Sequence, residues 1–304
     1  MAKVGEAMDI GIIGAGSLGL LYSFYLSKDY SLTLYTNRKQ QADLINKRGL
    51  SYFKDDTYTT AMIQATSDRN YKEDFLFVTV KQYDIEAIID VLKELSPRTI
   101  LFLQNGMGHL PYLSVLSKHQ ILLGISEHGA IRLNDHSVKH TGIGVTKISH
   151  YNQDKPQHSI FSQLLAEQHS LFGIVLKDDW HNMLTEKLIV NATINPLTAI
   201  LKVKNGELIK NNDFKQILYE LFKEVVLILD VQNEVKLWEH VQTICKKTEK
   251  NESSMYKDIQ AGRQTEIDSI LGYLIQRARK NQIMIPTITF LYHAIKGIEA
   301  CRTN

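Results

Sequence analysis

The sequence predicts an α/β protein in which an N-terminal domain built on a parallel sheet is followed by a C-terminal all-helical domain. Apolar strand-like runs alternate with helical stretches over the first half of the chain, which is typical of a parallel sheet covered by helices. From Asp179 onward the helical period of apolar residues dominates. The 304-residue chain is also long enough for two domains that each bury a core.

The first predicted strand, Asp9–Ile13, runs into a glycine-rich turn and then into an apolar helix. The spacing GxGxxG in this context indicates a Rossmann-like dinucleotide site. Gly14 would make the tight turn, Gly16 would let backbone N–H groups approach a pyrophosphate, and Gly19 would let helix and strand pack closely. The helix N-terminus favours negative charge. The predicted cofactor contacts in this turn are Gly14, Ala15, Gly16, Ser17, Leu18 and Gly19.

The end of the second predicted strand, Ser31–Tyr35, indicates which dinucleotide binds. Sites for NAD usually carry Asp or Glu here to hold the ribose 2′-hydroxyl, whereas this chain has Asn37, Arg38 and Lys39. A carboxylate would repel a 2′-phosphate, and Arg presents a planar fork of donors that matches phosphate. We therefore predict NADP(H), with Arg38 as the ligand of the 2′-phosphate. The alternative is that Arg38 and Lys39 are only the solvated start of a helix.

Three further strands complete the predicted sheet, at Phe75–Thr79, Thr99–Leu103 and Ile121–Gly124. Ligands of such sheets bind beyond the carboxyl ends of the strands. Lys81 follows the third strand of the chain and Asn105 follows the fourth. Both side chains are therefore candidates for contact with the cofactor.

The character of the chain changes after about residue 125, where short β-like runs such as Gly144–Ser149 are separated by polar residues and glycine. We expect an antiparallel closure of the first domain here. We place the domain boundary near residue 178, so that residues 1–178 form the NADP-binding Rossmann-like domain and residues 179–304 form a helical substrate and catalytic domain. A helix over Phe214–Val231 is predicted by its apolar residues at helical spacing.

The helical domain opens with a polar stripe on an otherwise apolar helix. Lys187, Asn191 and Asn195 recur every four residues and therefore lie on one face. Because Asn is costly to bury without a partner, the stripe favours a wet cavity or a ligand. An interdomain hydrogen-bond network or a solvated face is the alternative. Pro196 is expected to bend or end this helix.

Two later segments place polar side chains at helix starts. Asn251 and Ser254 precede one helical pattern, and Glu266 lies at the opening of another. From the residues alone, Ser254 can be an N-cap and Glu266 can be a first-turn acid favoured by the helix dipole.

Taken together in chain order, these motifs resemble the ketopantoate reductase family, the 2-dehydropantoate 2-reductases, over nearly the whole chain from about residue 9. The residues that carry the resemblance are Gly14-x-Gly16-x-x-Gly19, Lys81, Asn105-Gly-Met-Gly, His140-Thr-Gly-x-Gly144, Glu186-Lys-Leu-x-x-Asn191-x-x-x-Asn195-Pro-Leu-Thr-Ala, Ser253-Ser-Met-x-x-Asp258-Ile and Thr265-Glu-Ile-Asp268. One departure is Val203-Lys204-Asn205-Gly206-Glu207, where the family usually has Pro-Asn-Gly-Glu.

The resemblance implies NADPH-dependent reduction of the ketone of 2-dehydropantoate to D-pantoate, a step toward pantothenate and coenzyme A. It implies that Lys187 is the general acid and that Glu266 hydrogen-bonds a substrate hydroxyl and helps orient Lys187. The substrate-binding residues it implies are Asn191, Asn195 and Ser254, with Asn251 beside Ser254. Lys81 and Asn105 would line the nicotinamide side, and Arg38 would bind the 2′-phosphate. A reductase of another branched 2-keto acid and a non-catalytic NADP(H) sensor remain open.

Composition argues against several other classes of protein. The 35 basic and 33 acidic residues give a net charge of +2 without a basic tract, so no nucleic-acid partner is expected. Cys245 and Cys301 lie far apart and are expected to be inert thiols in a reducing compartment. Neither cysteine nor histidine shows metal-ligand spacing. No apolar stretch suits a bilayer span, so we expect a cytoplasmic enzyme with a small-molecule substrate and no membrane partner; apolar helix faces could support a homodimer.

Overall fold

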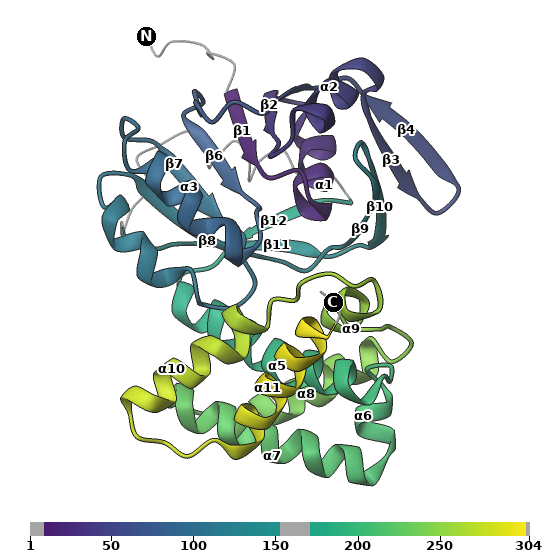
Figure 1. Ribbon diagram of the computed structural model, residues 1–304, viewed down its shortest axis with the longest axis vertical. Helices are drawn as coiled ribbons and strands as arrows, with labels where there is room; N and C mark the ends of the chain where they lie inside the picture. The colour runs from purple at the N-terminus through teal and green to yellow at the C-terminus, as the bar shows by residue number, and fades with distance from the viewer. Residues whose placement is uncertain (1–8, 153–170, 302–304) are drawn as a thin grey trace. The chain divides into compact units, whose positions relative to one another are not determined.

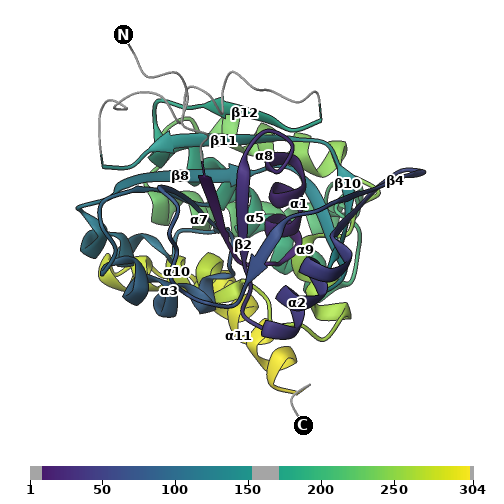
Figure 2. The ribbon, with the colours of Figure 1, turned by 90° about the horizontal axis from the view of Figure 1, so that it is seen from above.

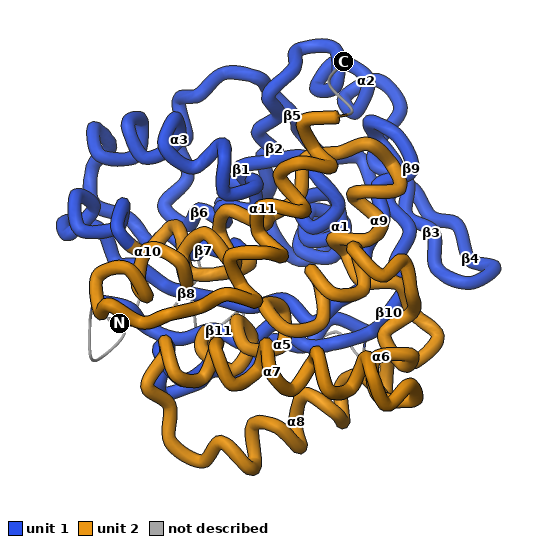
Figure 3. The backbone as a smooth tube through the Cα atoms, turned by 60° about the horizontal axis from the view of Figure 1, so that its bottom comes forward, with its two compact units in different colours: residues 1–104, 111–183 blue, residues 105–110, 184–304 orange. Residues whose placement is uncertain are grey.

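The computed structural model describes residues 9–152 and 171–301, and the chain divides into two compact units. Unit 1 comprises residues 1–104 and 111–183, and unit 2 comprises residues 105–110 and 184–304 (Figure 3). The short segment 105–110 therefore packs with the helical unit although the chain on both sides of it belongs to unit 1. The functional boundary that we place near residue 178 stays a prediction.

Unit 1 is built around an eight-stranded sheet with the strand order β12-β11-β8-β7-β6-β1-β2-β5 (Figure 1). Its strands are β1 (Asp9–Ile13), β2 (Ser31–Tyr35), β5 (Gln64–Thr66), β6 (Phe75–Val78), β7 (Thr99–Phe102), β8 (Gln120–Ser126), β11 (Val145–His150) and β12 (Gly173–Leu176). All neighbours from β5 to β8 pair in parallel. The five strands predicted for this sheet are confirmed, and β1 lies at the reversal of strand order where such sheets bind ligands.

Helices α1 (Ser17–Leu26), α2 (Lys39–Arg48) and α3 (Ile85–Leu92) belong to this unit. In α3 the buried side chains are Ile85, Ile88, Ile89 and Leu92, which recur at helical spacing and form one apolar face. Burying each of them contributes on the order of 2 kcal/mol. The α/β character predicted from alternating periodicities is thus confirmed.

A second sheet of four strands has the order β4-β3-β10-β9. Its strands are β3 (Leu50–Lys54), β4 (Thr57–Ala61), β9 (Gly129–Asn134) and β10 (Ser137–Gly142). Helix α1 packs against β1 and β2 of the large sheet and also against β3, β9 and β10 (Figure 2). Every residue from Gly19 to Leu26 is buried. This double contact explains why α1 is apolar on all sides.

The antiparallel closure expected after residue 125 is only partly right. Strand β11 pairs antiparallel with β8, but β12 joins β11 in parallel. Strands β9 and β10 leave the large sheet, and β10 pairs antiparallel with β9 and parallel with β3. Since β3 comes from much earlier in the chain, the local pattern after residue 125 carries no signal of that pairing.

Unit 2 is helical, as predicted. Its helices are α5 (Trp180–Leu201, which starts within unit 1), α6 (Glu207–Lys210), α7 (Asn212–Leu229), α8 (Glu234–Lys247), α9 (Ser254–Gln260), α10 (Tyr273–Lys280) and α11 (Pro286–Ala300), with a π-helical turn at Asp268–Gly272. Helix α7 buries one apolar face and packs against α8, α10 and α11. It begins at the Asn211 cap and ends where Asp230 adopts a left-handed conformation. No helix in the described ranges is both long and apolar enough for a membrane crossing.

Pro196 does not end α5, because the helix continues to Leu201; of the two outcomes expected from the sequence, the end of the helix is wrong and a bend stays a prediction. Proline removes one backbone donor from the helix interior. The neighbouring Ile194, Leu197 and Ala199 are at most 2% exposed. Burial of these side chains holds the segment helical and offsets the missing hydrogen bond.

Candidate functional site

The turn between β1 and α1 places a different requirement on each of its three glycines. Gly14 has φ +109°, a conformation that L side chains rarely adopt. A Cβ on Gly19 would lie 1.7 Å from the Gly14 carbonyl oxygen, so only glycine lets α1 pack this closely. A Cβ on Gly16 would meet no protein atom within 4 Å. Protein packing thus explains two of the glycines, and the open space above Gly16 fits the approach of a ligand.

The N-terminus of α1 opens directly onto this turn. Gly16 occupies the N-cap position in an extended conformation, and the first turn of the helix carries no acidic residue. Backbone N–H groups at a helix start favour an anion where no carboxylate satisfies them. The turn therefore fits the pyrophosphate of a dinucleotide, while the individual contacts of Ala15, Ser17 and Leu18 stay predictions.

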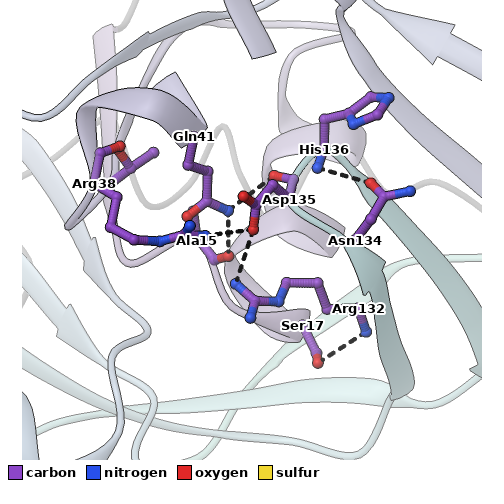
Figure 4. A network of polar contacts seen from close by, with 9 residues as sticks. Ala15, Ser17, Arg38, Gln41, Arg132, Asn134, Asp135 and His136 are labelled. Atoms are coloured by element: carbon purple, nitrogen blue, oxygen red, sulfur yellow. Dashed lines mark hydrogen bonds and ion pairs between the residues drawn. The ribbon is translucent and has the colours of Figure 1, made fainter. Parts of the chain in front are cut away.

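Arg38 lies at the N-cap position of α2, with half of its side chain exposed. Its guanidinium forms an ion pair with Asp135 in the turn between β9 and β10 (Figure 4). Lys39, the first residue of α2, instead pairs with Asp43 at 2.7 Å. Arg38 therefore does start a helix, as the alternative interpretation has it, and its charged group also faces an anion.

Gln41 connects the Arg38 cluster to the glycine turn. Its Nε2 donates to the Ala15 carbonyl oxygen at 3.1 Å and to the Asp135 carbonyl oxygen at 2.8 Å (Figure 4). Gln41, Arg132 and Asp135 were not predicted as neighbours of Arg38. The β9–β10 turn is distant from the glycine turn in the chain, and no local sequence pattern indicates that the two are in contact.

Lys81 lies just beyond the carboxyl end of β6, half-buried, and its carbonyl oxygen accepts from Asp84 N at 3.0 Å. Because β6 pairs in parallel with β1, Lys81 and the glycine turn lie at the same edge of the sheet, beyond the carboxyl ends of the two strands. The Thr79 hydroxyl donates to the Gly14 carbonyl oxygen at 2.9 Å and ties the two strand ends together. The role of Lys81 beside the nicotinamide stays a prediction.

In unit 2 the predicted polar stripe lies on α5 as expected. Lys187 and Asn195 are half-buried, and Asn191 is only 7% exposed. Leu188 and Ala192 beside them are fully buried. An ammonium group and two amides therefore lie on one face of α5 next to buried apolar side chains, a setting that suits a polar ligand.

Glu266 and Asn105 are brought together although they lie far apart in the chain. Asn105 Nδ2 donates to Glu266 Oε2 at 2.9 Å, and Glu266 is 8% exposed. Gly106, at φ +78°, lies so close to the π-helical turn that a Cβ would stand 2.1 Å from the Ser269 carbonyl oxygen. The segment 105–110 thus packs against the π-helical turn that follows Glu266. Both residues are predicted site residues, but their hydrogen bond was not predicted.

Ser253, and not Ser254, is the N-cap of α9, because its hydroxyl accepts from Tyr256 N at 3.1 Å. Ser254 is the first helical residue and is exposed. The interpretation of Ser254 as a cap is therefore wrong, since the helix begins one residue earlier than that interpretation requires. Ser254 keeps a side chain that can reach a ligand.

Thr198 joins the end of the stripe to the start of α9. Its hydroxyl oxygen lies 2.8 Å from Ser253 Oγ and 3.1 Å from the Asn195 carbonyl oxygen. Asn251 is exposed, and its carbonyl oxygen accepts from Asn205 N at 3.0 Å. Hydrogen bonds between these segments of unit 2 thus connect the backbone near Asn195, Asn251 and Ser254, three of the proposed substrate-binding residues.

His140, which opens one of the family-like motifs, is part of a buried polar cluster in unit 1. Its Nδ1 lies 3.1 Å from the Tyr25 hydroxyl and 3.2 Å from the Tyr52 hydroxyl, and its Nε2 lies 3.2 Å from His128 Nδ1. Burial lowers the pKa of His128 to about 4. These contacts favour a structural role for neutral imidazoles between α1 and the second sheet.

Cys245 is a buried free thiol and Cys301 is an exposed one. Burial raises the pKa of Cys245 to about 12, which keeps that thiol protonated. Within residues 9–152 and 171–301, no group of three His, Cys, Asp or Glu side chains is placed to hold a metal ion.

Comparison with known proteins identifies the chain over most of its length. The family model described as "Ketopantoate reductase PanE/ApbA" matches residues 10–153, and "Ketopantoate reductase PanE/ApbA C terminal" matches residues 179–299. A 2-dehydropantoate 2-reductase of Bacillus subtilis (strain 168) is 43% identical, covering 96% of this chain and 98% of that protein. Another from Listeria innocua is 40% identical, with 97% and 98% covered.

Solved structures agree with this relationship. The crystal structure of a probable 2-dehydropantoate 2-reductase from Bacillus subtilis has a TM-score of 0.90 at 42% identity, covering 96% of this chain and 100% of that one. A ternary structure of D-mandelate dehydrogenase with NADH and anilino(oxo)acetate has a TM-score of 0.86 at 22% identity, with 98% and 100% covered, and it shows a shared fold alone. On the strength of both family matches and these relatives, the chain belongs to the ketopantoate reductase family.

Proposed function

We propose that this chain is an oxidoreductase that reduces the ketone of 2-dehydropantoate to the hydroxyl of D-pantoate with NADPH, in pantothenate and coenzyme A biosynthesis. The observation that carries the proposal is the stripe of Lys187, Asn191 and Asn195 on an otherwise apolar helix. Relatives that share 43% and 40% of their residues and bear the name 2-dehydropantoate 2-reductase support it.

The residues of unit 1 fit a dinucleotide. Backbone N–H groups from Ala15 to Gly19 would hold the pyrophosphate, whereas Gly14 N donates to the Tyr35 carbonyl oxygen at 2.9 Å and shapes the turn. Arg38 would bind the 2′-phosphate. Lys81 and Asn105 would line the nicotinamide side. When bound, the dinucleotide supplies the hydride that the ketone carbon receives.

Lys187 is proposed as the general acid. Negative charge grows on the ketone oxygen as its carbon is reduced, and an ammonium group at that oxygen stabilises the charge. Lys187 Nζ then donates a proton to the oxygen, which completes the hydroxyl, and regains a proton from solvent. The amides of Asn191 and Asn195, one and two turns along the same face, would hold the polar groups of the substrate.

Glu266 is proposed to accept a hydrogen bond from a substrate hydroxyl and to help orient Lys187. The 2.9 Å hydrogen bond from Asn105 fixes its carboxylate in a nearly buried position. A buried acceptor of this kind discriminates against a substrate that lacks the hydroxyl, because the carboxylate would lose its partner. Ser254 and Asn251 would add contacts from the start of α9.

Two alternatives use the same residues differently. A reductase of another branched 2-keto acid would keep Lys187 but would not need the substrate hydroxyl at Glu266. A non-catalytic sensor would bind NADP(H) without turnover. A homodimer is a further proposal; a relative described as a dimeric ketopantoate reductase from Staphylococcus aureus is 19% identical and supports the fold alone.

The test is NADPH oxidation with 2-dehydropantoate by wild type, Lys187→Ala and the control Lys215→Ala, which removes an exposed lysine from α7. We expect turnover by wild type and the control, and a loss of about a thousandfold or more in Lys187→Ala with NADPH still bound. Bound NADPH without turnover would overturn the assignment. Keto acids with and without the 4-hydroxyl would then separate the alternative substrate from the sensor.

A further inference from the structure

We propose that Arg132 is a second cationic ligand of the 2′-phosphate beside Arg38, and that Asp135 holds the place of the phosphate until the dinucleotide binds. This inference rests on the proposed NADPH dependence. It assigns a role in cofactor selection to the β9–β10 hairpin, which carries no glycine-loop motif and in which Asp135 lies 97 residues after Arg38.

Two guanidinium groups converge on one carboxylate oxygen. Arg38 Nη2 binds Asp135 Oδ1, and Arg132 Nη1 lies 3.9 Å from the same oxygen (Figure 4). An anionic oxygen at this position is therefore within reach of both arginines. A phosphate presents several such oxygens and is matched by the planar fork of arginine.

The cluster is fixed beside the glycine turn at two points. Arg132 N donates to Ser17 Oγ at 3.1 Å, at the first residue of α1. Gln41, which is nearly fully buried, donates to the carbonyl oxygens of both Ala15 and Asp135. These hydrogen bonds hold the backbone of the β9–β10 turn against the turn that would take the pyrophosphate.

The direction of the Arg132 side chain follows from its strand. Ile131 and Leu133 flank it on β9, and successive side chains of a strand point to opposite faces. Arg132 therefore points away from these two exposed apolar side chains and toward Asp135. A strand restricts the backbone more than a loop, so the guanidinium is presented from a fixed position.

Charge balance explains how the cluster can choose between cofactors. Arg38 and Arg132 together carry two positive charges against the single negative charge of Asp135, and Lys39 is already paired with Asp43. A dianionic 2′-phosphate matches the two arginines better than one carboxylate does. NADH offers only a neutral hydroxyl there, so it cannot displace Asp135 from Arg38 and gains nothing from Arg132.

The experiment measures the dissociation constants of NADPH and NADH by fluorescence titration for wild type, Arg132→Gln, Asp135→Asn and the control Lys139→Gln. The control removes one exposed positive charge from the same hairpin. We expect Arg132→Gln to weaken NADPH binding about tenfold and to leave NADH binding within about twofold. Asp135→Asn should tighten NADPH binding by about threefold, because the competing carboxylate charge is gone.

Loss of affinity for both nucleotides alike, or no loss beyond that of Lys139→Gln, would overturn the role of Arg132. Weaker NADPH binding by Asp135→Asn would overturn the displacement of Asp135. If wild type binds NADPH and Arg132→Gln binds it equally well, only this inference fails. If wild type prefers NADH, the proposed NADPH dependence fails first.

Discussion

Gly16→Ala and Gly19→Ala are expected to separate ligand binding from folding, although both residues belong to the same glycine motif. A Cβ on Gly16 meets no protein atom within 4 Å, and the backbone there, at φ −81° and ψ −166°, is open to alanine. A Cβ on Gly19 would lie 1.7 Å from the oxygen and 2.9 Å from the carbon of the Gly14 carbonyl. Those are backbone atoms, so no side-chain rotation relieves the overlap.

The expected free energies of unfolding follow from these contacts. Gly16→Ala restricts the unfolded chain, which stabilises by about 0.5–1 kcal/mol, and weakens the N-cap by a similar amount, so the net change is about zero. Gly19→Ala gains about 1 kcal/mol of helix propensity but forces α1 away from β1. Overpacking of this kind costs about 3 kcal/mol or more, which leaves a net loss of at least about 2 kcal/mol.

For NADPH binding, the variant of interest is Gly16→Ala, whose fold should be intact. The methyl group of Gly16→Ala fills the space proposed for the pyrophosphate, so NADPH affinity should fall by about tenfold or more while the fold is intact. Urea unfolding followed by circular dichroism measures the stability, and fluorescence titration measures the affinity. Equal destabilisation by both variants would refute the packing argument. Wild-type NADPH affinity in Gly16→Ala would refute the assignment of the pyrophosphate to this turn.

Two further predictions concern unit 2. Burial lowers the pKa of His109 from 6.5 to about 4, so the folded protein resists protonation and its free energy of unfolding falls as the pH drops below 6.5. The loss reaches about 3 kcal/mol at pH 4, and His109→Gln should flatten the pH profile of urea unfolding by that amount; parallel profiles would contradict this. Ser253→Ala removes the α9 cap and the partner of Thr198, so it should lower the free energy of unfolding by about 1–2 kcal/mol. Ser254→Ala should change stability by less than about 0.5 kcal/mol but raise KM for the keto acid, and the proposed division of roles fails if the two variants behave alike.

The strands around the candidate cofactor site are a case in which the local pattern was sufficient. The predicted bounds of β1 and β2 agree with the structure to the residue. Both are apolar runs that end at glycine or polar residues, and buried parallel strands need little more. The positive φ of Gly14 and the close packing at Gly19 also follow from the spacing of the glycines.

The second sheet and the continuation of α5 could not be predicted in the same way. The pairing of β10 with β3 joins segments that are distant in the chain, such as Ser137 and Ser51. Strand pairing over such a distance depends on which edges the folded chain leaves available. Pro196 breaks the local rule for helices, and only the burial of its neighbours explains why the helix persists.

The α/β class, the glycine turn, and the helical face that carries Lys187, Asn191 and Asn195 can be predicted from local patterns, because each depends on residues close together in the chain. Contacts between distant groups emerge when the chain folds. The folded chain pairs Asn105 with Glu266 and places Arg38 and Arg132 beside the same oxygen of Asp135. Such contacts depend on how the elements pack, and a sequence pattern of period two or 3.6 carries no record of them.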